Sequence, residues 1–407
     1  MVIKPMIRNN ICMNSHPAGC AKSVQRQIDY VRANMKATEG APKLVLVIGC
    51  SSGYGLASRI AAAFGYGAAT VGLSFERAAS ESKPGTPGFY NNAVFDKQAE
   101  KAGLVAETFD ADAFSDEARA KAVQAIRKAA ERAGIPAKVD LVIYSLASPM
   151  RLDPKTGITH RSAIKPIGRS FSGKTVDMMN ATIFESSAEA ATEEEIAGTI
   201  KVMGGEDWEL WMDALAKEGV LSTSSRSLAY TYLGPELSWA IYKNGTIGRA
   251  KEDLERACRE INKKHAGTIA GAWVSVNKAL VTRASAVIPI IPFYVSTLFK
   301  VMKEMGLHEG CIEQIVRLYK DRLYTAEAVA DAGKTLTDSE NRIRIDDWEM
   351  REDVQKETAA RMEKATDQTL TELADVAGFR SDFMEVHGFE VPGVDYEADV
   401  NPLEVII

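Results

Sequence analysis

Apolar residues in the first third of the chain form short continuous runs, and each run is followed by a segment whose apolar positions recur with a helical period. Leu44 to Ile48 is the first clear run; it ends in a glycine-rich turn, and Leu56 to Phe64 follows with helical spacing. Later segments of both kinds predict strands over 69–76, 104–110 and 139–146, and helices over 92–102 and 116–133. Such alternation predicts a parallel sheet covered on both faces.

The pattern changes over residues 148–221, where charged and small residues replace the apolar runs. Lys155-Thr156-Gly157 predicts a hairpin, and Thr192 with Glu195 has the spacing of a capping box that opens a short helix. We interpret this segment as an insertion that covers the sheet on its substrate side.

Regular alternation then resumes and predicts strands over 227–233 and 273–281, and helices near 235–243, over 247–264 and from about Ser285 onward. Residues 336–407 are charged and contain short helical patches without a strand run, which predicts a C-terminal helical wrap. No repeat or low-complexity tract divides the chain. We therefore expect an α/β fold with a doubly wound parallel sheet of six to seven strands, in one enlarged domain over 1–407.

Composition narrows the possible partners. The chain is 46% hydrophobic and 26% charged, which is typical of a globular protein, and its net charge of −6 offers no basic field for nucleic acid. The N-terminus has no apolar run behind a basic flank, so no signal peptide is expected. The most apolar stretch, 286–299, is short and contains two prolines, which argues against a membrane span. A cytoplasmic location is expected.

The five cysteines are scattered and odd in number, which is typical of reduced thiols. Cys12, His16 and Cys20 are spaced four apart and could share one face of a helix. A structural zinc site usually needs four ligands with close cysteine pairs, and Pro17 and Gly19 are expected to break such a helix. We expect no metal.

The turn after the first strand has the spacing G-x3-G-x-G, over Gly49-Cys50-Ser51-Ser52-Gly53-Tyr54-Gly55. Glycines there let the backbone approach a pyrophosphate, and the following helix N-terminus supplies free N–H groups, as in Rossmann-type folds. Glu76 ends the next strand 21 residues after Gly55, where a carboxylate accepts bonds from the adenosine ribose hydroxyls. This favours NADH over NADPH, although the neighbouring Arg77 could hold a 2′-phosphate.

Asp112 and Ala113 follow the third strand and are placed to meet the adenine ring. The alternative for Asp112 is a helix cap, because a helix is expected to begin after Phe114.

Tyr242 and Lys251 are candidates for reductase chemistry, which needs a phenol to polarise a carbonyl and a cation beside it. On one unbroken helix they would lie on opposite faces, about 13 Å apart along the axis. Asn244-Gly245 predicts a break, with a new helix near Thr246 that folds Lys251 back toward the tyrosine. The alternative is a packed aromatic residue and a solvated charge.

Tyr230 and Tyr232 lie two apart on an expected strand and would share one of its faces. Tyr232 is nearer the turn at Gly234-Pro235 and is our candidate for a second contact with a substrate carbonyl. We assign Tyr230 to the core.

Taken together, these motifs resemble the trans-2-enoyl-CoA reductases, also described as FabV-type enoyl-acyl-carrier-protein reductases, which are enlarged relatives of the short-chain dehydrogenases. The likeness runs nearly end to end. Its segments are 10–12, 16–17, 49–57, 75–76, 85–88, 144–149, 204–208, the Tyr242-x8-Lys251 pair, 299–304 and 308–314.

The resemblance implies reduction of trans-2-enoyl thioesters with NADH in fatty acid biosynthesis, with hydride passing to the β-carbon. It implies that Tyr242 donates the proton, that Lys251 binds the cofactor and that Tyr232 contacts the substrate. Further cofactor contacts implied by the resemblance come from Gly49, Cys50, Ser51, Ser52, Gly53, Tyr54, Phe75, Glu76, Asp112, Ala113, Leu146, Ala147, Leu280, Val281 and Thr282. It also implies a monomer.

Two departures from ordinary short-chain dehydrogenases weaken a ketoreductase interpretation. The tyrosine and lysine are not four residues apart, and Tyr144-Ser145-Leu146-Ala147 stands where Asn-Asn-Ala-Gly is usual. A carbonyl reductase or alcohol dehydrogenase remains the alternative enzyme, and a silent dinucleotide-binding sensor the alternative outside catalysis. Residues 287–299 fit either a wall for the acyl chain or a plain core helix. The carrier, coenzyme A or acyl carrier protein, stays open.

Overall fold

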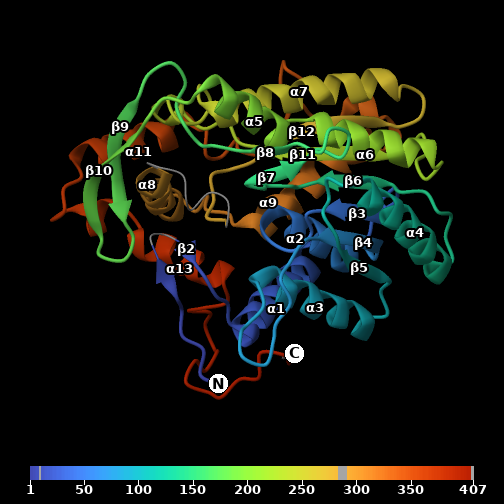
Figure 1. Ribbon diagram of the computed structural model, residues 1–407, viewed down its shortest axis with the longest axis horizontal. Helices are drawn as coiled ribbons and strands as arrows, with labels where there is room; N and C mark the ends of the chain where they lie inside the picture. The colour runs from blue at the N-terminus through green and yellow to red at the C-terminus, as the bar shows by residue number, and fades with distance from the viewer. Residues whose placement is uncertain (9–10, 283–290, 405–407) are drawn as a thin grey trace.

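A parallel sheet of seven strands is the centre of the computed structural model, which describes residues 1–8, 11–282 and 291–404. Its strand order is β13-β12-β11-β6-β3-β4-β5, and Figure 1 shows most of these strands from top to bottom in that order. Their bounds are β3 Leu44–Ile48, β4 Ala69–Ser74, β5 Ala106–Asp110, β6 Leu141–Tyr144, β11 Arg226–Thr231, β12 Gly271–Val276 and β13 Ile343–Arg344. The order reverses between β3 and β6, which opens a crevice at their carboxyl ends.

Alternate side chains of β3 point to opposite faces of the sheet, and each face has its own core. Val45 and Val47 pack beneath α1, α2, α3 and α9, whereas Leu44, Leu46 and Ile48 pack beneath α4, α6 and α7. These helices are α1 Pro17–Asn34, α2 Gly53–Ile60, α3 Pro87–Lys101, α9 Cys311–Leu318, α4 Asp116–Ala133, α6 Glu206–Lys217 and α7 Thr246–Lys264. The doubly wound sheet expected from the sequence is confirmed.

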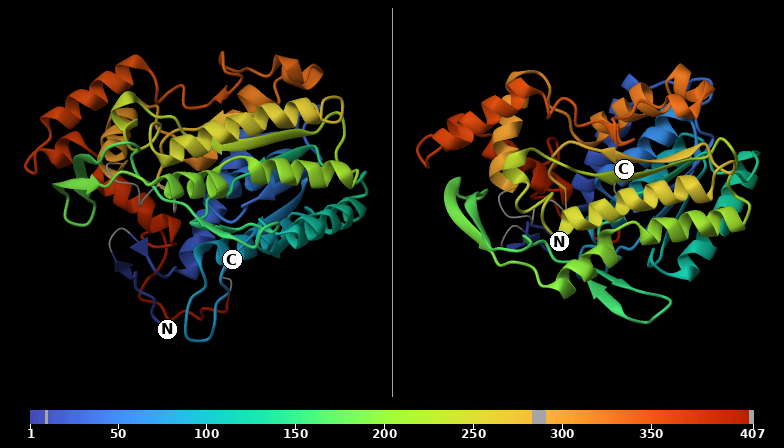
Figure 2. Two further views of the ribbon diagram at one scale, coloured as in Figure 1. Left: turned by 45° about the horizontal axis from the view of Figure 1, so that its top comes forward. Right: turned by 90° about the horizontal axis from the view of Figure 1, so that it is seen from above.

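A third apolar cluster lies beyond the carboxyl ends of the strands. It is built on α8 (Ile291–Glu304), against which α11 (Glu352–Lys364), α13 (Val376–Val386) and β9 (Phe171–Asp177) pack. Both views of Figure 2 keep the red C-terminal helices on the side of the molecule opposite to α4. Ile291 to Phe299 are buried like a core helix, and residues 287–290 of the suggested acyl wall lie outside the described residues.

The insertion contains the expected hairpin, β7 (Met150–Leu152) with β8 (Thr159–Arg161), and the capping box that opens α5 (Glu193–Met203). A second hairpin, β9 with β10 (Thr182–Ala188), was not expected from the sequence. Shorter elements are β1 Ile7–Arg8, β2 Ile11–Cys12, π-helical turns Ala61–Gly65 and Tyr319–Leu323, 3₁₀ turns Glu236–Ser238 and Ala332–Lys334, α10 Ala326–Ala330 and α12 Leu370–Leu373.

Three sequence expectations about the elements are wrong. The helix expected over 235–243 is a single 3₁₀ turn followed by irregular turns, because Gly234-Pro235 and Asn244-Gly245 leave too few residues between them. The segment 336–407 does contain a strand, β13, which is the outermost neighbour of β12. Gly19 does not break a helix but lies inside α1, which begins at Pro17, where a missing N–H costs nothing, and which leaves Cys12 outside as expected.

The start of the helix expected near Ser285 lies outside the described residues; α8 is described from Ile291. Among the helices that the structure describes, none combines the length and apolar character needed to cross a membrane.

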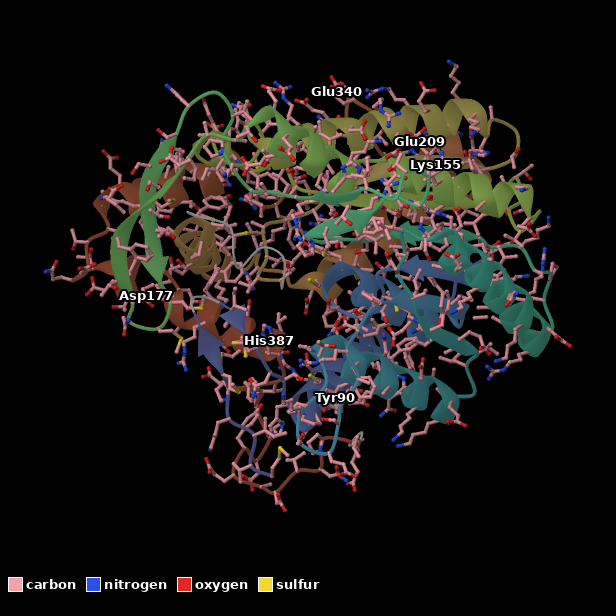
Figure 3. All side chains as sticks on the ribbon, viewed as in Figure 1. Tyr90, Lys155, Asp177, Glu209, Glu340 and His387 are labelled. Carbon is pink, nitrogen blue, oxygen red and sulfur yellow. The ribbon has the colours of Figure 1, made fainter. Side chains whose placement is uncertain are left out.

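The C-terminal segment returns to the first helices. Tyr90 on α3, labelled in Figure 3, donates its hydroxyl to the Pro402 carbonyl at 2.8 Å, and the His16 N–H donates to the His387 carbonyl at 2.9 Å. The N-terminal ammonium of Met1 also binds the Val400 carbonyl at 2.7 Å. Both ends of the chain are therefore tied to the same side of the sheet.

We predict that Asp207→Ala destabilises the protein by about 3 kcal/mol, because it leaves the Arg119 guanidinium buried without its partner. Arg119 joins α4 to α6 through Asp207, with side chains 5% and 1% exposed. Asp116, which binds the same arginine, is 80% exposed, so Asp116→Ala should cost under about 1 kcal/mol. Urea denaturation measures both; equal losses would contradict the prediction.

Candidate functional site

The glycine-rich turn lies in the crevice where the strand order reverses, between β3 and α2. Gly49 and Gly53 have φ of +88° and +53°, and a Cβ on Gly55 would overlap the Gly49 carbonyl oxygen. Ser52, the N-cap of α2, makes no side-chain capping bond among the described residues, so the first N–H groups of the helix remain for an anion. This geometry fits a dinucleotide pyrophosphate.

Glu76 lies next to this turn at the end of β4. The Ser51 hydroxyl donates to its Oε1 at 2.7 Å, and Gly88 leaves room for the carboxylate, which a Cβ there would overlap. Phe75 precedes Glu76 and is 79% exposed, which is unusual for a phenylalanine. A carboxylate has about four lone-pair sites, so it can accept from more than one donor.

Asp112 does not cap the helix after Phe114. Its Oδ1 accepts from the Phe114 N–H at 3.0 Å in a local turn, and Ser115 caps α4 by accepting from the Ala118 N–H at 3.1 Å. The Ala113 carbonyl accepts from the Trp211 indole at 3.1 Å, which fixes this loop to α6. The capping alternative for Asp112 is therefore wrong. Asp112 and Ala113 lie in the loop between β5 and α4.

Two further loops meet the glycine-rich turn. A Cβ on Gly49 would lie 3.3 Å from the Leu146 side chain after β6, and one on Gly53 would lie 3.7 Å from the Thr282 methyl group after β12. Leu280 and Val281 are buried in the same loop. The Tyr54 side chain points instead to the Lys278 carbonyl and to Gln314, so only its backbone faces the turn.

Tyr232 and Tyr242 lie against each other beyond the end of β11. Their ring centroids are 4.9 Å apart and the rings stand at 80°. Burial raises the pKa of the Tyr242 phenol well above its ordinary value, so it is protonated at neutral pH and can donate. The Tyr230 hydroxyl is instead hydrogen-bonded to the Ser58 hydroxyl at 2.6 Å, and Tyr230 packs against the core, as expected.

Lys251 lies in the second turn of α7, where the new helix places it. Its ammonium donates to the Tyr230 carbonyl at 3.3 Å, two residues before Tyr232. The Gly248 N–H in the first turn binds the Tyr242 carbonyl at 3.0 Å. Burial lowers the pKa of Lys251 to about 8. The break at Gly245 thus places Tyr232, Tyr242 and the Lys251 ammonium near the end of β11. Tyr242 lies in an irregular turn before α7 and not on a helix of its own.

Comparison with known proteins decides the family. The family model described as the trans-2-enoyl-CoA reductase catalytic region matches residues 83–324, and that of the NAD(P)H binding domain of trans-2-enoyl-CoA reductase matches 2–81. The chain belongs to the trans-2-enoyl-CoA reductase family. A third model of an enoyl reductase FAD binding domain matches 337–400.

Relatives match this family member over their whole length. The trans-2-enoyl-CoA reductase [NADH] of Treponema denticola is 56% identical, with 100% of each chain covered. The enoyl-[acyl-carrier-protein] reductase [NADH] of Cytophaga hutchinsonii is 51% identical, with 98% of each covered. The crystal structure of the Treponema denticola enzyme in complex with NAD has a TM-score of 0.90, with 98% of each chain covered.

The described residues over 337–400 do not fit a flavin. They contain no glycine-rich turn between a strand and a helix, and their helices α11 and α13 pack on α8. A Cβ on Gly388 would overlap the His16 carbonyl oxygen, and the Trp348 ring is covered by the Arg317 guanidinium at 4.2 Å. Gly388 and Trp348 are thus already in contact with protein groups.

Sequence reasoning missed buried polar residues around this site, above all Glu349. It stands in the charged run Asp346-Asp347-Trp348-Glu349, which is typical of an exposed loop, yet it is 0% exposed and accepts from the Tyr232 hydroxyl at 3.0 Å. Lys278 is also buried, with a pKa lowered by burial to about 8. Nothing in the local sequence signals that these residues are buried.

We predict that Gly55→Ala weakens NADH binding by roughly tenfold or more, because the new Cβ forces the turn away from the Gly49 carbonyl. Fluorescence titration with NADH measures the affinity. Gly103→Ala is the control: φ is +69° there, but a Cβ would meet nothing within 4 Å. It should cost stability and leave the affinity unchanged; equal weakening in both variants would contradict the prediction.

Proposed function

We propose that this protein uses NADH to reduce the carbon–carbon double bond of trans-2-enoyl thioesters, carried on coenzyme A or acyl carrier protein, to saturated acyl thioesters in fatty acid biosynthesis. The observation that carries the proposal is the Tyr232–Tyr242 pair, packed edge to face at the end of β11 together with Lys251. Full-length identity of 56% to a relative of that name supports the substrate class.

The proposed cofactor contacts follow the crevice. Gly49, Cys50, Ser51, Ser52, Gly53 and Tyr54 hold the pyrophosphate through backbone N–H groups. Glu76 accepts from the adenosine ribose, with Phe75, Asp112 and Ala113 at the adenine. Leu146, Ala147, Leu280, Val281 and Thr282 form the remaining walls, because their loops meet the turn. The two relatives whose names specify NADH agree with the preference that Glu76 suggests.

Bound NADH supplies a hydride to the β-carbon of the enoyl thioester. The electron pair of the double bond moves toward the thioester oxygen, where the protonated phenol of Tyr242 donates a hydrogen bond and stabilises the developing negative charge. The Tyr242 phenol then supplies the proton that ends on the α-carbon, so the net addition is a hydride and a proton. Lys251 binds the cofactor, and Tyr232 provides the second substrate contact.

We further infer a monomer with one catalytic domain over 1–407, in which 148–221 covers the substrate side and 336–407 wraps the sheet. The ties from residues 402 and 387 back to α3 and α1 support one unit. The five cysteines form no disulfide with one another, which agrees with the cytoplasmic location that we propose.

NADH absorbance tests the function directly when purified protein is mixed with crotonyl-CoA, with NADPH and a simple ketone in parallel. Oxidation of NADH by the enoyl thioester alone supports the reductase. Turnover of the ketone alone would move the protein to the carbonyl reductases, and binding of NADH without turnover would favour a sensor.

We predict that Tyr242→Phe lowers kcat by roughly 10²–10⁴-fold, the scale of losing a general acid, while NADH binding persists. Tyr66→Phe is the matched control, because Tyr66 is a buried tyrosine of the core packed on Tyr319. It should retain activity. Near-normal turnover by Tyr242→Phe would remove Tyr242 from the role of proton donor.

We predict that NADH affinity falls as pH rises through about 8, because the Lys251 ammonium, whose pKa burial has lowered, loses its charge there. Below that pH the charge is present and the affinity should be constant. Titrations between pH 6 and 10 measure it, and Lys251→Met should bind weakly without this dependence. A pH dependence that survives in Lys251→Met would assign the titration to another group.

A further inference from the structure

A carboxylate from the C-terminal segment reaches the Tyr232–Tyr242 pair. Glu349 follows β13 in the chain and is completely buried. Its Oε1 accepts from the Tyr232 hydroxyl at 3.0 Å and from the Tyr294 hydroxyl at 2.7 Å, and its Oε2 accepts from the Ala279 N–H at 2.7 Å. A carboxylate with donors on both oxygens is held in one orientation.

These donors indicate that Glu349 carries a negative charge. Burial raises its pKa, while the Lys278 ammonium nearby and the donated hydrogen bonds oppose that shift. Gln355 extends the network, since its amide donates to the Tyr294 hydroxyl at 3.0 Å and to the Glu349 carbonyl at 2.7 Å. These hydrogen bonds restrict the orientations of the Glu349, Tyr294 and Gln355 side chains.

The bond to Glu349 limits what Tyr232 can do. A phenol has one proton, and Tyr232 donates it in the hydrogen bond to the carboxylate. While that bond is made, the hydroxyl has no proton to donate to a substrate carbonyl, so the substrate contact proposed for Tyr232 is a packing contact. Gly234 leaves the space that the Tyr232 hydroxyl occupies, because a Cβ at this position would lie 2.6 Å from it. The bond fixes the Tyr232 ring against the Tyr242 ring, which leaves Tyr242 as the donor.

The hydrogen bond from the Ala279 N–H to Glu349 lies at the start of the loop proposed to contact the cofactor. Ala279 precedes Leu280, Val281 and Thr282, and the adjacent Lys278 N–H donates to Gln314 at 2.9 Å. The loop after β12 is therefore held at neighbouring residues by α9 and by the C-terminal segment. Through Glu349 the same carboxylate reaches both the tyrosine pair and the cofactor loop.

We propose that Glu349 is a positioning residue, which fixes the Tyr232 ring against Tyr242 and the 280–282 loop against the glycine-rich turn. The proposal rests on the function proposed above. It gives the segment 337–400 a role in the reaction without a flavin.

Glu349→Gln tests the proposal, because an amide cannot accept on both ends and must give up at least one of the bonds. We expect kcat/KM for crotonyl-CoA to fall roughly tenfold, the usual effect of losing a hydrogen bond to a charged group. Tyr232→Phe should have a similar effect, and the double variant should lie within about threefold of the weaker single variant. Losses that multiply would overturn the link through Tyr232.

NADH affinity provides a second readout that does not need turnover. Glu349→Gln should weaken NADH binding several-fold through the Ala279 contact, whereas Tyr232→Phe should not. Unchanged affinity in Glu349→Gln would overturn the part of the proposal that concerns the loop. Since NADH binding is independent of the enoyl substrate, failure of the wild type to reduce crotonyl-CoA would count against the proposed function instead.

Asp347→Asn is the control for stability. Asp347 is two residues from Glu349 and binds Arg317 at 2.7 Å and Arg322 at 2.9 Å. The Asp347→Asn substitution should therefore lower Tm without changing kcat/KM. Equal losses of activity in Asp347→Asn would reduce Glu349 to a structural role. If Glu349→Gln does not fold, Glu349→Asp takes its place, because it keeps the charge but shortens the reach of the carboxylate.

Discussion

The strands of the described central sheet run in one direction, so their carboxyl ends lie along one edge. Because the strand order reverses between β3 and β6, the loops that leave these strands diverge there and open a crevice. The glycine-rich turn, the loop with Leu146 and the loop with Thr282 meet at this place. The positions of the cofactor turn, the tyrosine pair and the lysine all depend on this shared edge.

The carboxyl edge of the sheet is covered by helices that follow the last long strand, β12, in the chain. The crevice is covered by α8, and α11 and α13 pack on α8 to bury its remaining surface. Burial has a chemical consequence, because it keeps the Tyr242 phenol protonated and brings the pKa of Lys251 down to about 8. The C-terminal segment thus contributes to the chemistry by excluding water and by supplying Glu349.

The regular elements were predictable where a local pattern controls them. The helix over 116–133 agrees with α4 at both ends, because Ser115 caps it and Gly134 ends it in a left-handed conformation. The expected helix over 235–243 failed where two turn signals lay too close together. The strand β13 was missed, since two residues paired only to β12 leave no periodic signal.

The sequence alone determined six of the seven described strands of the central sheet, most of the helices that cover them, the glycine-rich turn with Glu76 beside it, and the break at Asn244-Gly245 before the helix of Lys251. Each of these depends on glycines, caps or apolar periods between residues close together in the chain. Only the tertiary structure decided that Glu349, 117 residues beyond Tyr232, is buried and accepts a hydrogen bond from the Tyr232 hydroxyl. A charged residue is buried only when distant donors compensate its lost hydration, and no local pattern records which donors the fold will bring to it.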